Sequence, residues 1–175
     1  KGKHKVFVNS NKVNLGIAEH INKVISLARG ELIVVAAGDD ISLSHRVERI
    51  TSSWMSCNKK CHSIYSSVIE IDENSRDLGE KCHPNIFSNK TLHEISAVNL
   101  YVTGASHAWS KDVFSVFGDL IPSVVHEDCT LPFRSKLLGD VLLIDEPLVK
   151  YRVNVGISAG YDNVKSVEEE VKIID

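Results

Sequence analysis

The chain has 175 residues, of which 43% are hydrophobic and 25% are charged, with a formal net charge of −3 at pH 7. The slightly negative charge excludes any electrostatic argument for binding nucleic acid or an anionic membrane surface. No apolar run approaches the roughly 20 residues that a membrane-spanning helix needs, and we expect no signal peptide. We therefore expect one soluble globular domain over residues 1–175, located in the cytoplasm. Peripheral binding at the inner face of the membrane is an alternative.

The first part of the chain predicts a strand, a helix and a second strand. Lys5–Val8 is a short apolar run, and the three-and-four spacing of apolar residues over Ile17–Ala28 is typical of an amphipathic helix. Arg29-Gly30 has the composition of a helix end. Leu32–Ala37 is apolar on both faces, which predicts a buried, parallel strand. Together these elements predict a right-handed βαβ unit.

The middle of the chain predicts alternating helices and strands. A helix should begin after Asp39-Asp40, with Ser42 or Ser44 at its cap and Ile50 and Trp54 in its apolar stripe. The stripe also includes Val47 and Met55. The elements expected next are a strand at Ser63–Asp72, an exposed loop at Asp77–Asn89, a short helix at Thr91–Leu100 and a small-residue turn at Thr103–Trp109.

The last third predicts two helices, a core strand and a final helix. Lys111–Gly118 should be a short helix closed by glycine. A second helix should end at Leu138, with Pro132 in its first turn and Asp128 or Thr130 at its cap. The remaining expected elements are a core strand at Val141–Ile144, an extended edge at Pro147–Tyr151 and a helix at Asn163–Ile174.

Two adjacent carboxylates, Asp39 and Asp40, follow the Leu32–Ala37 run and Gly38. In open α/β sheets, ligands bind at the carboxyl ends of strands. Two acids there, beside a glycine that lets the backbone come close, suit a hard cation that carries a phosphate-bearing ligand. From these residues alone, the alternative is an Asx turn in which Asp39 or Asp40 caps the next helix.

The four cysteines leave two interpretations open. Cys57, Cys61 and Cys82, with His62 and His83, could form a zinc site, although their spacing is not one of the compact zinc patterns. The alternative, which we favour, is free thiols in a reducing compartment, since a domain of this size needs no disulfides.

Three segments in a fixed order resemble family 2 glycosyltransferases of the GT-A fold. The similarity extends from about Val6 to about Ser158, and the ordered set is more specific than any one motif. The segments are Asn14-Leu15-Gly16 with Ala28-Arg29-Gly30-Glu31 and Gly38-Asp39-Asp40; Thr103-Gly104-Ala105-Ser106 with Phe117-Gly118; and His126-Glu127-Asp128 with Phe133-Arg134, Tyr151-Arg152 and Ser158.

The resemblance implies a Rossmann-like α/β/α sandwich with a mixed, mostly parallel central sheet. It implies inverting transfer of a sugar from a nucleotide-diphosphate sugar, such as a UDP-sugar, to a hydroxyl of a saccharide or lipid-linked acceptor. The usual setting of the family is cell-surface polysaccharide biosynthesis. Asp39 and Asp40 match the metal-binding acids, so Mn²⁺ or Mg²⁺ is the implied cofactor. Glu127 and Asp128 match the catalytic pair, with Asp128 as the general base.

The same resemblance implies residues on the donor and acceptor sides of the site. Two family positions differ here: Ala37 replaces the first acid of the metal motif, and Asn154 replaces a histidine that serves some members as a metal ligand. The implied donor-side residues are Gly38, Asn22, Tyr151 and Arg152. The implied acceptor-side residues are Gly104, Ala105, Ser106 and Trp109, although a tryptophan here is also typical of a core.

The family has a first strand and a base-recognising acid ahead of the segment that begins here. The chain starts at Lys1 rather than at a methionine, so we expect a piece of a longer protein, an N-terminally truncated partial domain with weak or no activity alone. An uncovered sheet edge would then favour a homo-oligomer or another covering chain. Two other functions stay open: a catalytically inactive, glycosyltransferase-like binding domain, and a phosphatase-like hydrolase that uses Asp39-Asp40.

Overall fold

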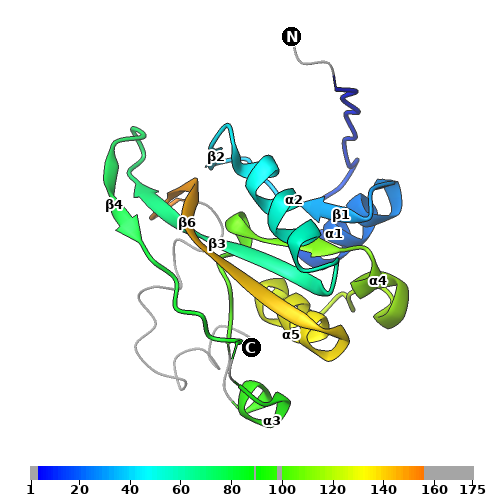
Figure 1. The fold of residues 1–175 in the computed structure, drawn as a ribbon. Coiled ribbons are helices and arrows are strands. Elements are labelled where there is room, and N and C mark those ends of the chain that lie inside the picture. Colours follow the sequence, from blue (N-terminus) through cyan, green and yellow to red (C-terminus); the bar gives the residue numbers. More distant parts are fainter. Residues whose placement is uncertain (1–3, 89, 98–99, 156–175) are drawn as a thin grey trace, which may run out of the picture.

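The computed structural model describes residues 4–88, 90–97 and 100–155. The predicted helix at Asn163–Ile174 and the family position Ser158 lie outside these residues. The elements in chain order are α1 (Gly16–Leu27), β1 (Leu32–Val34), β2 (Ile41–Ser42), α2 (Arg46–Ser56), β3 (Cys61–Ile71), β4 (Asp77–Lys81), α3 (Leu92–Ser96), the 3₁₀ turn η1 (Gly104–Ser106), β5 (Ala108–Ser110), α4 (Asp112–Phe117), α5 (Glu127–Leu138) and β6 (Asp140–Arg152) (Figure 1).

One mixed, curled sheet forms the middle of the molecule. Its strand order is β1-β5-β3-β6-β2, and β4 pairs with β3 beyond this path. The α/β class and the mixed sheet are confirmed. The expectation of a mostly parallel sheet is wrong, because within the described residues only the β3–β6 pair is parallel and the other four strand pairs are antiparallel. The consecutive strands β3 and β4 are joined by a short turn, which gives an antiparallel pair, whereas the parallel strands β3 and β6 need a long connection.

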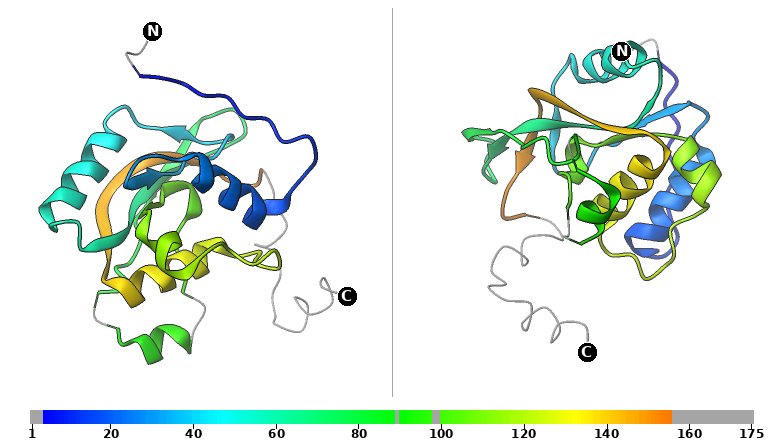
Figure 2. Two further views of the ribbon diagram at one scale, coloured as in Figure 1. Left: turned by 90° about the vertical axis from the view of Figure 1, so that its right-hand side faces the viewer. Right: turned by 60° about the horizontal axis from the view of Figure 1, so that its bottom comes forward.

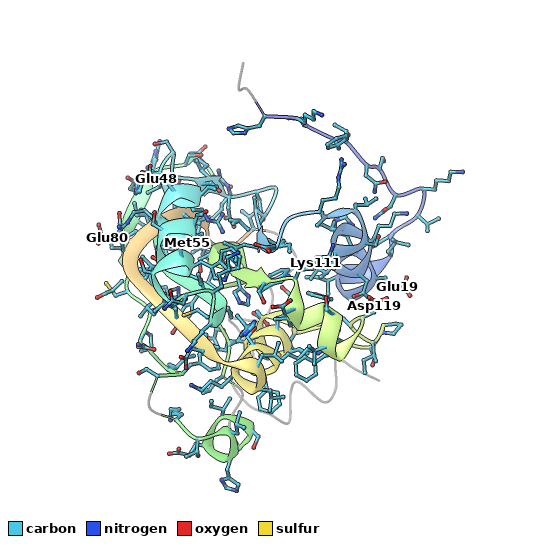
Figure 3. The ribbon with its side chains drawn as sticks, turned by 45° about the vertical axis from the view of Figure 1, so that its right-hand side comes forward. Glu19, Glu48, Met55, Glu80, Lys111 and Asp119 are labelled. Atoms are coloured by element: carbon cyan, nitrogen blue, oxygen red, sulfur yellow. The ribbon has the colours of Figure 1, made fainter. Side chains whose placement is uncertain are left out.

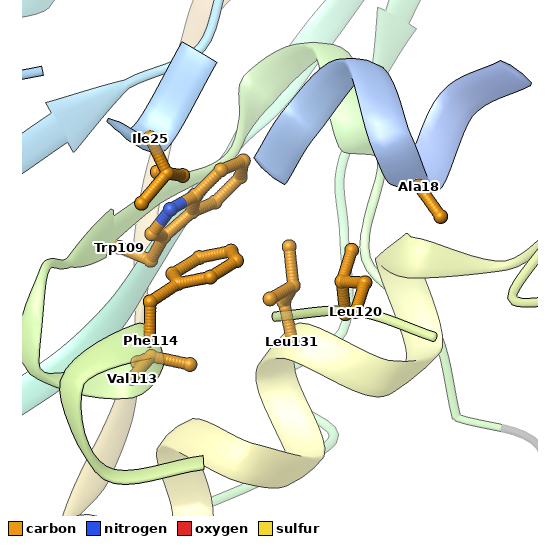
Figure 4. Packing of buried hydrophobic residues seen from close by; sticks show 7 residues of the cluster. All are labelled: Ala18, Ile25, Trp109, Val113, Phe114, Leu120 and Leu131. Atoms are coloured by element: carbon orange, nitrogen blue, oxygen red, sulfur yellow. The ribbon is translucent and has the colours of Figure 1, made fainter. Parts of the chain in front are cut away.

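Helices cover both faces of the sheet (Figure 2). On one face, Ile50 and Trp54 of α2 pack on Ile64 of β3 and Leu148 of β6. On the other face, α1, α4 and α5 pack around Trp109 of β5 in a cluster of seven buried residues (Figure 4). The apolar residues of these helices recur at helical spacing and therefore lie along one side of each helix. That side packs against the sheet. Val47 and Met55, predicted in the α2 stripe, are instead 59% and 55% exposed, and Figure 3 shows Met55 on the outer side of the helix.

The predicted βαβ unit is wrong. The run Lys5–Val8 is not a strand: Val6, Phe7 and Val8 are 83%, 74% and 92% exposed, and this segment extends away from the sheet (Figure 1). A strand needs a partner, and this run has none among the described residues. The run Leu32–Ala37 is shorter than predicted, since β1 covers only Leu32–Val34, and it is half-buried rather than buried. Its one partner is β5, to which it is antiparallel, so β1 is an edge of the described sheet.

The strand β6 differs from the prediction in a second way. The segment Pro147–Tyr151 is not an edge, because β6 is one strand of 13 residues between β3 and β2. Pro147 has no N–H for a ladder hydrogen bond, and the β3–β6 register shifts between Ser66 and Ser67, opposite Ile144 and Pro147. Such an irregularity is where an internal strand tolerates proline.

Strand β4 occupies part of the predicted loop at Asp77–Asn89. All five of its residues are exposed, so no apolar alternation marked it in the sequence. The helices predicted at Lys111–Gly118 and up to Leu138 are confirmed as α4 and α5, and the one predicted at Thr91–Leu100 is present as the shorter α3. α3 begins with a capping box between Thr91 and Glu94, and α4 ends at Gly118, which has φ 71°.

No helix among the described residues has the length and hydrophobicity needed to cross a membrane.

We predict that Gly139→Ala lowers the free energy of unfolding by about 1–3 kcal/mol. Gly139 joins α5 to β6, and a Cβ there would lie 2.5 Å from the backbone oxygen of Lys60 and 3.0 Å from Cδ2 of His62. The backbone must move, because that oxygen belongs to Lys60, the residue immediately before β3. Urea unfolding measures the change. Gly38→Ala is the matched control, since its Cβ would meet no atom within 4 Å; equal midpoints for the two variants would contradict the prediction.

Candidate active site

The two acids predicted to hold a metal lie in the segment between β1 and β2. The carboxylate of Asp39 is exposed, and Asp40 is half-buried. Oδ1 of Asp40 accepts a hydrogen bond of 2.7 Å from the backbone N–H of Arg152, at the end of β6. Burial raises the pKa of Asp40 above its ordinary value, and this hydrogen bond acts in the opposite direction. The capping alternative is wrong: α2 starts at Arg46, after an N-cap at His45 whose side chain makes no capping bond.

Arg152 fixes this acidic turn to the rest of the sheet. Its Nε donates to the backbone oxygen of Asp39 at 2.9 Å. Its Nη1 donates to the backbone oxygens of Asp72 and Glu73 at 2.6 and 3.0 Å, and Nη2 donates to Oγ of Ser75 at 2.9 Å. The guanidinium therefore ties the acidic turn to the turn between β3 and β4. A contact of Arg152, or of the half-buried Tyr151 beside it, with a donor stays a prediction.

Glu127 and Asp128 form the first turn of α5. The prediction that Asp128 or Thr130 is the N-cap is wrong. The N-cap is His126, whose side chain makes no capping bond. Pro132 lies in the second turn rather than the first, where its ring is buried. Because the helix begins at Glu127, both carboxylates lie beside unpaired backbone N–H groups and the positive end of the helix dipole.

The environment of these two carboxylates favours their protonated forms. Oδ1 of Asp128 is buried without a hydrogen-bond partner among the described residues. Burial raises the pKa of Asp128, opposed by the charge of His126 and by backbone N–H groups. Burial also raises the pKa of Glu127, and the charge of Asp128 raises it further. A carboxylate with a raised pKa is a better proton acceptor than an exposed one, as a general base requires.

The turn η1 lies directly against this pair. A Cβ at Gly104 would be 3.2 Å from Oε1 of Glu127 and 3.9 Å from Cβ of Asp128. Val102, just before the turn, donates its N–H to the backbone oxygen of Asp128 at 3.2 Å. The structure therefore brings together two motifs that are more than twenty residues apart in the sequence. A residue without a side chain at position 104 is what permits the close approach.

The other predicted acceptor residues lie deeper. Ser106 is fully buried; its Oγ donates to the backbone oxygen of Thr103 at 3.0 Å and accepts from the N–H of Ser66 at 3.3 Å. Trp109 is 4% exposed and packs between Ile25 and Phe114 in the core (Figure 4). The core alternative is therefore the one that the structure shows for Trp109, because β5 places its side chain under α1 and α4. Ala105 is half-buried, with its backbone oxygen turned to Arg46.

Two predicted donor-side residues have different surroundings. The amide of Asn22 in α1 donates from Nδ2 to the backbone oxygen of Leu120 and accepts the N–H of Leu120 at Oδ1, both at 2.8 Å. This pair of bonds holds the segment between α4 and α5 against α1. Gly38 is exposed, with open space around it. Whether either residue contacts a donor stays a prediction.

Sequence reasoning missed two residues beside the site. Arg46 is 1% exposed and contacts both Ser42 and Ala105, although an arginine in an amphipathic helix is usually exposed. His83 is half-buried, and its Nε2 lies 2.9 Å from Oγ1 of Thr103, next to Gly104. Burial lowers the pKa of His83, as does the charge of Lys81. No motif signalled Arg46, and the sequence suggested His83 only as part of the zinc interpretation, because the contacts of both residues are created by the fold.

The zinc interpretation has no support in the structure. In the described part of the chain, no three His, Cys, Asp or Glu side chains are grouped to hold a metal. All four cysteines are free, as we favoured. Asp39 has an exposed carboxylate, and Oδ1 of Asp40 accepts the N–H of Arg152. Binding of Mg²⁺ or Mn²⁺ by these two acids stays a prediction.

Comparisons with known proteins point to one class. No protein-family model matches the chain. An uncharacterised glycosyltransferase of Methanocaldococcus jannaschii, MJ1057, is 36% identical to it over 80 residues, which are 46% of this chain and 27% of the relative. The solved structure of S. aureus TarS residues 1–349 in complex with UDP-GlcNAc has a similar fold, with a TM-score of 0.54 and 12% identity over 81% of this chain and 40% of that one.

The chain is thus glycosyltransferase-like in sequence over 80 residues and in its fold. It spans 27% of the length of MJ1057 and 40% of the TarS chain in that structure.

Proposed function

We propose that this chain is part of an inverting family 2 glycosyltransferase of the GT-A fold. The donor would be a nucleotide-diphosphate sugar of the UDP type, and the acceptor a hydroxyl of a saccharide or lipid-linked saccharide in cell-surface polysaccharide assembly. The observation that carries the proposal is the packing of Gly104 against Glu127 and Asp128, with a buried, unpaired oxygen on Asp128. The similarity to MJ1057 and to TarS, whose structure contains UDP-GlcNAc, supports the same function.

In this mechanism the acceptor hydroxyl binds beside η1, where Gly104 lies against the two acids. Asp128 takes the proton of the hydroxyl as its oxygen attacks the anomeric carbon from the face opposite the diphosphate. The new carbon–oxygen bond forms while the bond to the diphosphate oxygen breaks, and UDP leaves. The raised pKa of Asp128 makes it a stronger base than an exposed carboxylate. Glu127 shares the buried site and orients the acceptor.

The diphosphate would be held at the acidic turn. Asp39 and Asp40 would hold Mn²⁺ or Mg²⁺, which when bound neutralises the charge that builds on the leaving diphosphate. Asp40 is already oriented by the N–H of Arg152, and Asp39 presents an exposed carboxylate. Gly38 has open space around it, so a phosphate can approach its backbone closely.

Calorimetric titration of UDP into the full-length protein tests this assignment. We predict binding that requires Mn²⁺ and that weakens at least about 100-fold in Asp39→Ala, since even the neighbours of metal ligands contribute about 10–100-fold to affinity. The Asp39 carboxylate makes no hydrogen bond with another described residue, so thermal stability should not change. The matched control is Asp145→Ala, an exposed aspartate in the irregular part of β6.

Two results would contradict the proposal. Equal affinity in Asp39→Ala and wild type would exclude the metal site at Asp39. UDP binding with no turnover of any UDP-sugar would favour the inactive binding domain, for which the replacement of an acid by Ala37 is the specific observation.

A further inference from the structure

Arg46, at the start of α2, is a buried charge that has no direct counter-ion among the described residues. Its side chain is 1% exposed and is among the largest of the fully buried ones. No carboxylate of the described residues lies within ion-pair distance of it, and its Nε has no hydrogen-bond partner there. Its two bonded nitrogens contact neutral groups: Nη1 donates to Oγ of Ser42 at 2.9 Å, and Nη2 donates to the backbone oxygen of Ala105 at 2.8 Å.

Burial of the Arg46 guanidinium without a counter-ion does not favour the stability of the folded protein. A buried cation loses its hydration, and burial lowers the pKa of Arg46 accordingly, opposed only by the charge of Asp40. The neighbouring His107 adds no second positive charge, because burial and the charge of Arg46 lower its pKa to about 3. Apolar side chains that replace buried ions are often neutral or stabilising. A reason other than stability is therefore needed for an arginine here.

The two contacts of Arg46 belong to opposite halves of the site. Ser42 lies two residues after Asp40, in the short strand that follows the acidic turn. Ala105 is in η1, next to Gly104, which packs against Glu127. The contact between Arg46 and Ala105 spans 59 residues of sequence. One rigid, planar guanidinium therefore joins the segment proposed to hold the diphosphate to the turn proposed to receive the acceptor.

We propose that Arg46 is a positioning residue that couples the two halves, so that binding of a nucleoside diphosphate with a divalent cation at the acidic turn orders η1 beside Asp128. In this inference, the nature of the ligand rests on the proposed function. The contacts of Arg46 with the two segments do not depend on that function. A change at Asp40 reaches Ser42 through two residues of backbone, and Arg46 transmits it to the backbone oxygen of Ala105. A lysine keeps the charge but offers one flexible point of contact in place of the fork.

The experiment compares Arg46→Met and Arg46→Lys with wild type, in the full-length protein. Arg49→Met is the matched control, one turn along the same helix, where Nε donates to Oε2 of Glu146 at the surface. Hydrogen exchange is followed in peptides that cover residues 38–43 and 103–107, without ligand and with UDP plus Mn²⁺. Thermal unfolding, UDP affinity and turnover of a UDP-sugar are measured on the same samples.

In wild type and Arg49→Met, we expect UDP plus Mn²⁺ to slow exchange in both segments. In Arg46→Met, we expect 103–107 to exchange about tenfold faster without ligand, because a charged hydrogen bond is lost. UDP should then protect residues 38–43 alone. The donor KM should stay within about threefold while kcat falls at least about tenfold, with an unchanged or higher Tm. For Arg46→Lys, the exchange rate of residues 103–107 and kcat should lie between those of wild type and Arg46→Met.

Protection of both segments by UDP in Arg46→Met would overturn the proposal, as would a fall in Tm with equal losses in binding and turnover, which indicates a purely structural role. If wild type itself does not respond to UDP and Mn²⁺, the proposed function fails. The ligand-free comparison still decides the link: equal exchange of 103–107 in wild type and Arg46→Met would show that Arg46 does not hold η1.

Discussion

Asp128→Asn is expected to lower the rate of sugar transfer by about 10²–10⁴-fold, the usual contribution of a general base. The amide has nearly the same shape as the carboxylate but cannot accept the proton of the acceptor hydroxyl. UDP affinity should stay the same, because the acidic turn that is proposed to hold the diphosphate is a separate segment. The measurement is UDP release by the full-length protein, from the UDP-sugar that wild type turns over fastest.

The same variant should be more stable than wild type at neutral pH. Because the pKa of Asp128 is raised in the folded protein, its favourable contribution to stability is present below the ordinary carboxyl pKa and is lost as the pH rises through the raised one. Asparagine does not titrate, so the stability difference should grow from acid to neutral pH. Thermal midpoints between pH 3 and pH 8 measure it.

Thr130→Ala is the control for Asp128→Asn. It removes a side-chain hydrogen bond at the same helix start, from Oγ1 of Thr130 to the backbone oxygen of His126 at 3.1 Å. We expect it to retain turnover. Full activity in Asp128→Asn would remove Asp128 from the mechanism, and equal losses in both variants would show that the helix start, rather than the base, had been tested.

Trp109→Ala is expected to lower the free energy of unfolding by about 3–5 kcal/mol. The ring is buried between α1, α4 and α5, 6.3 Å from the ring centre of Phe114 and 5.1 Å from that of His107. Its removal leaves a cavity in the cluster of Figure 4, and a loss of this size is a large part of the 5–15 kcal/mol that holds a typical domain folded. Urea unfolding of the variant measures the loss.

The control for Trp109 is Tyr101→Ala, an aromatic residue that is 63% exposed and should change stability by less than about 0.5 kcal/mol. The free energy of unfolding of Trp109→Phe should lie between that of wild type and that of Trp109→Ala. If Trp109 instead presented a face to the acceptor sugar, Trp109→Ala would leave the unfolding midpoint unchanged and raise the acceptor KM.

Local elements of this fold could be predicted from sequence, but strand partners could not. The helix at Ile17–Ala28 lies within one residue of α1, and Lys111–Gly118 contains α4, because apolar spacing and terminal glycines act within a few residues. The parallel pairing assigned to Leu32–Ala37 was wrong because an apolar run reports burial rather than the direction of its neighbour. β4 had no apolar pattern to find, since all of its residues are exposed.

The candidate site divides in the same way. Physical reasoning alone identified Asp39-Asp40, whereas the importance of Glu127, Asp128 and Gly104 came from resemblance, and the structure shows that these three residues meet. Arg46 could not be found, because its burial depends on Ala105, which is 59 residues away. A charged residue on a helix is ordinarily solvated, and the burial of this one depends on tertiary contacts that its local sequence does not reveal.

The hydrogen bond from Arg152 to Asp40 has a consequence for the order in which the chain folds. The two residues are 112 positions apart, so their contact closes one of the longest loops in the molecule. Loop closure of this length is entropically slow, and local helices form long before it. The acidic turn therefore takes its final shape only when the last strand docks. During synthesis, the helices of the described residues and strands β1, β3, β4 and β5 can be in place while the acidic turn is still incomplete, and arrival of β6, which is the pairing partner of β2, completes it.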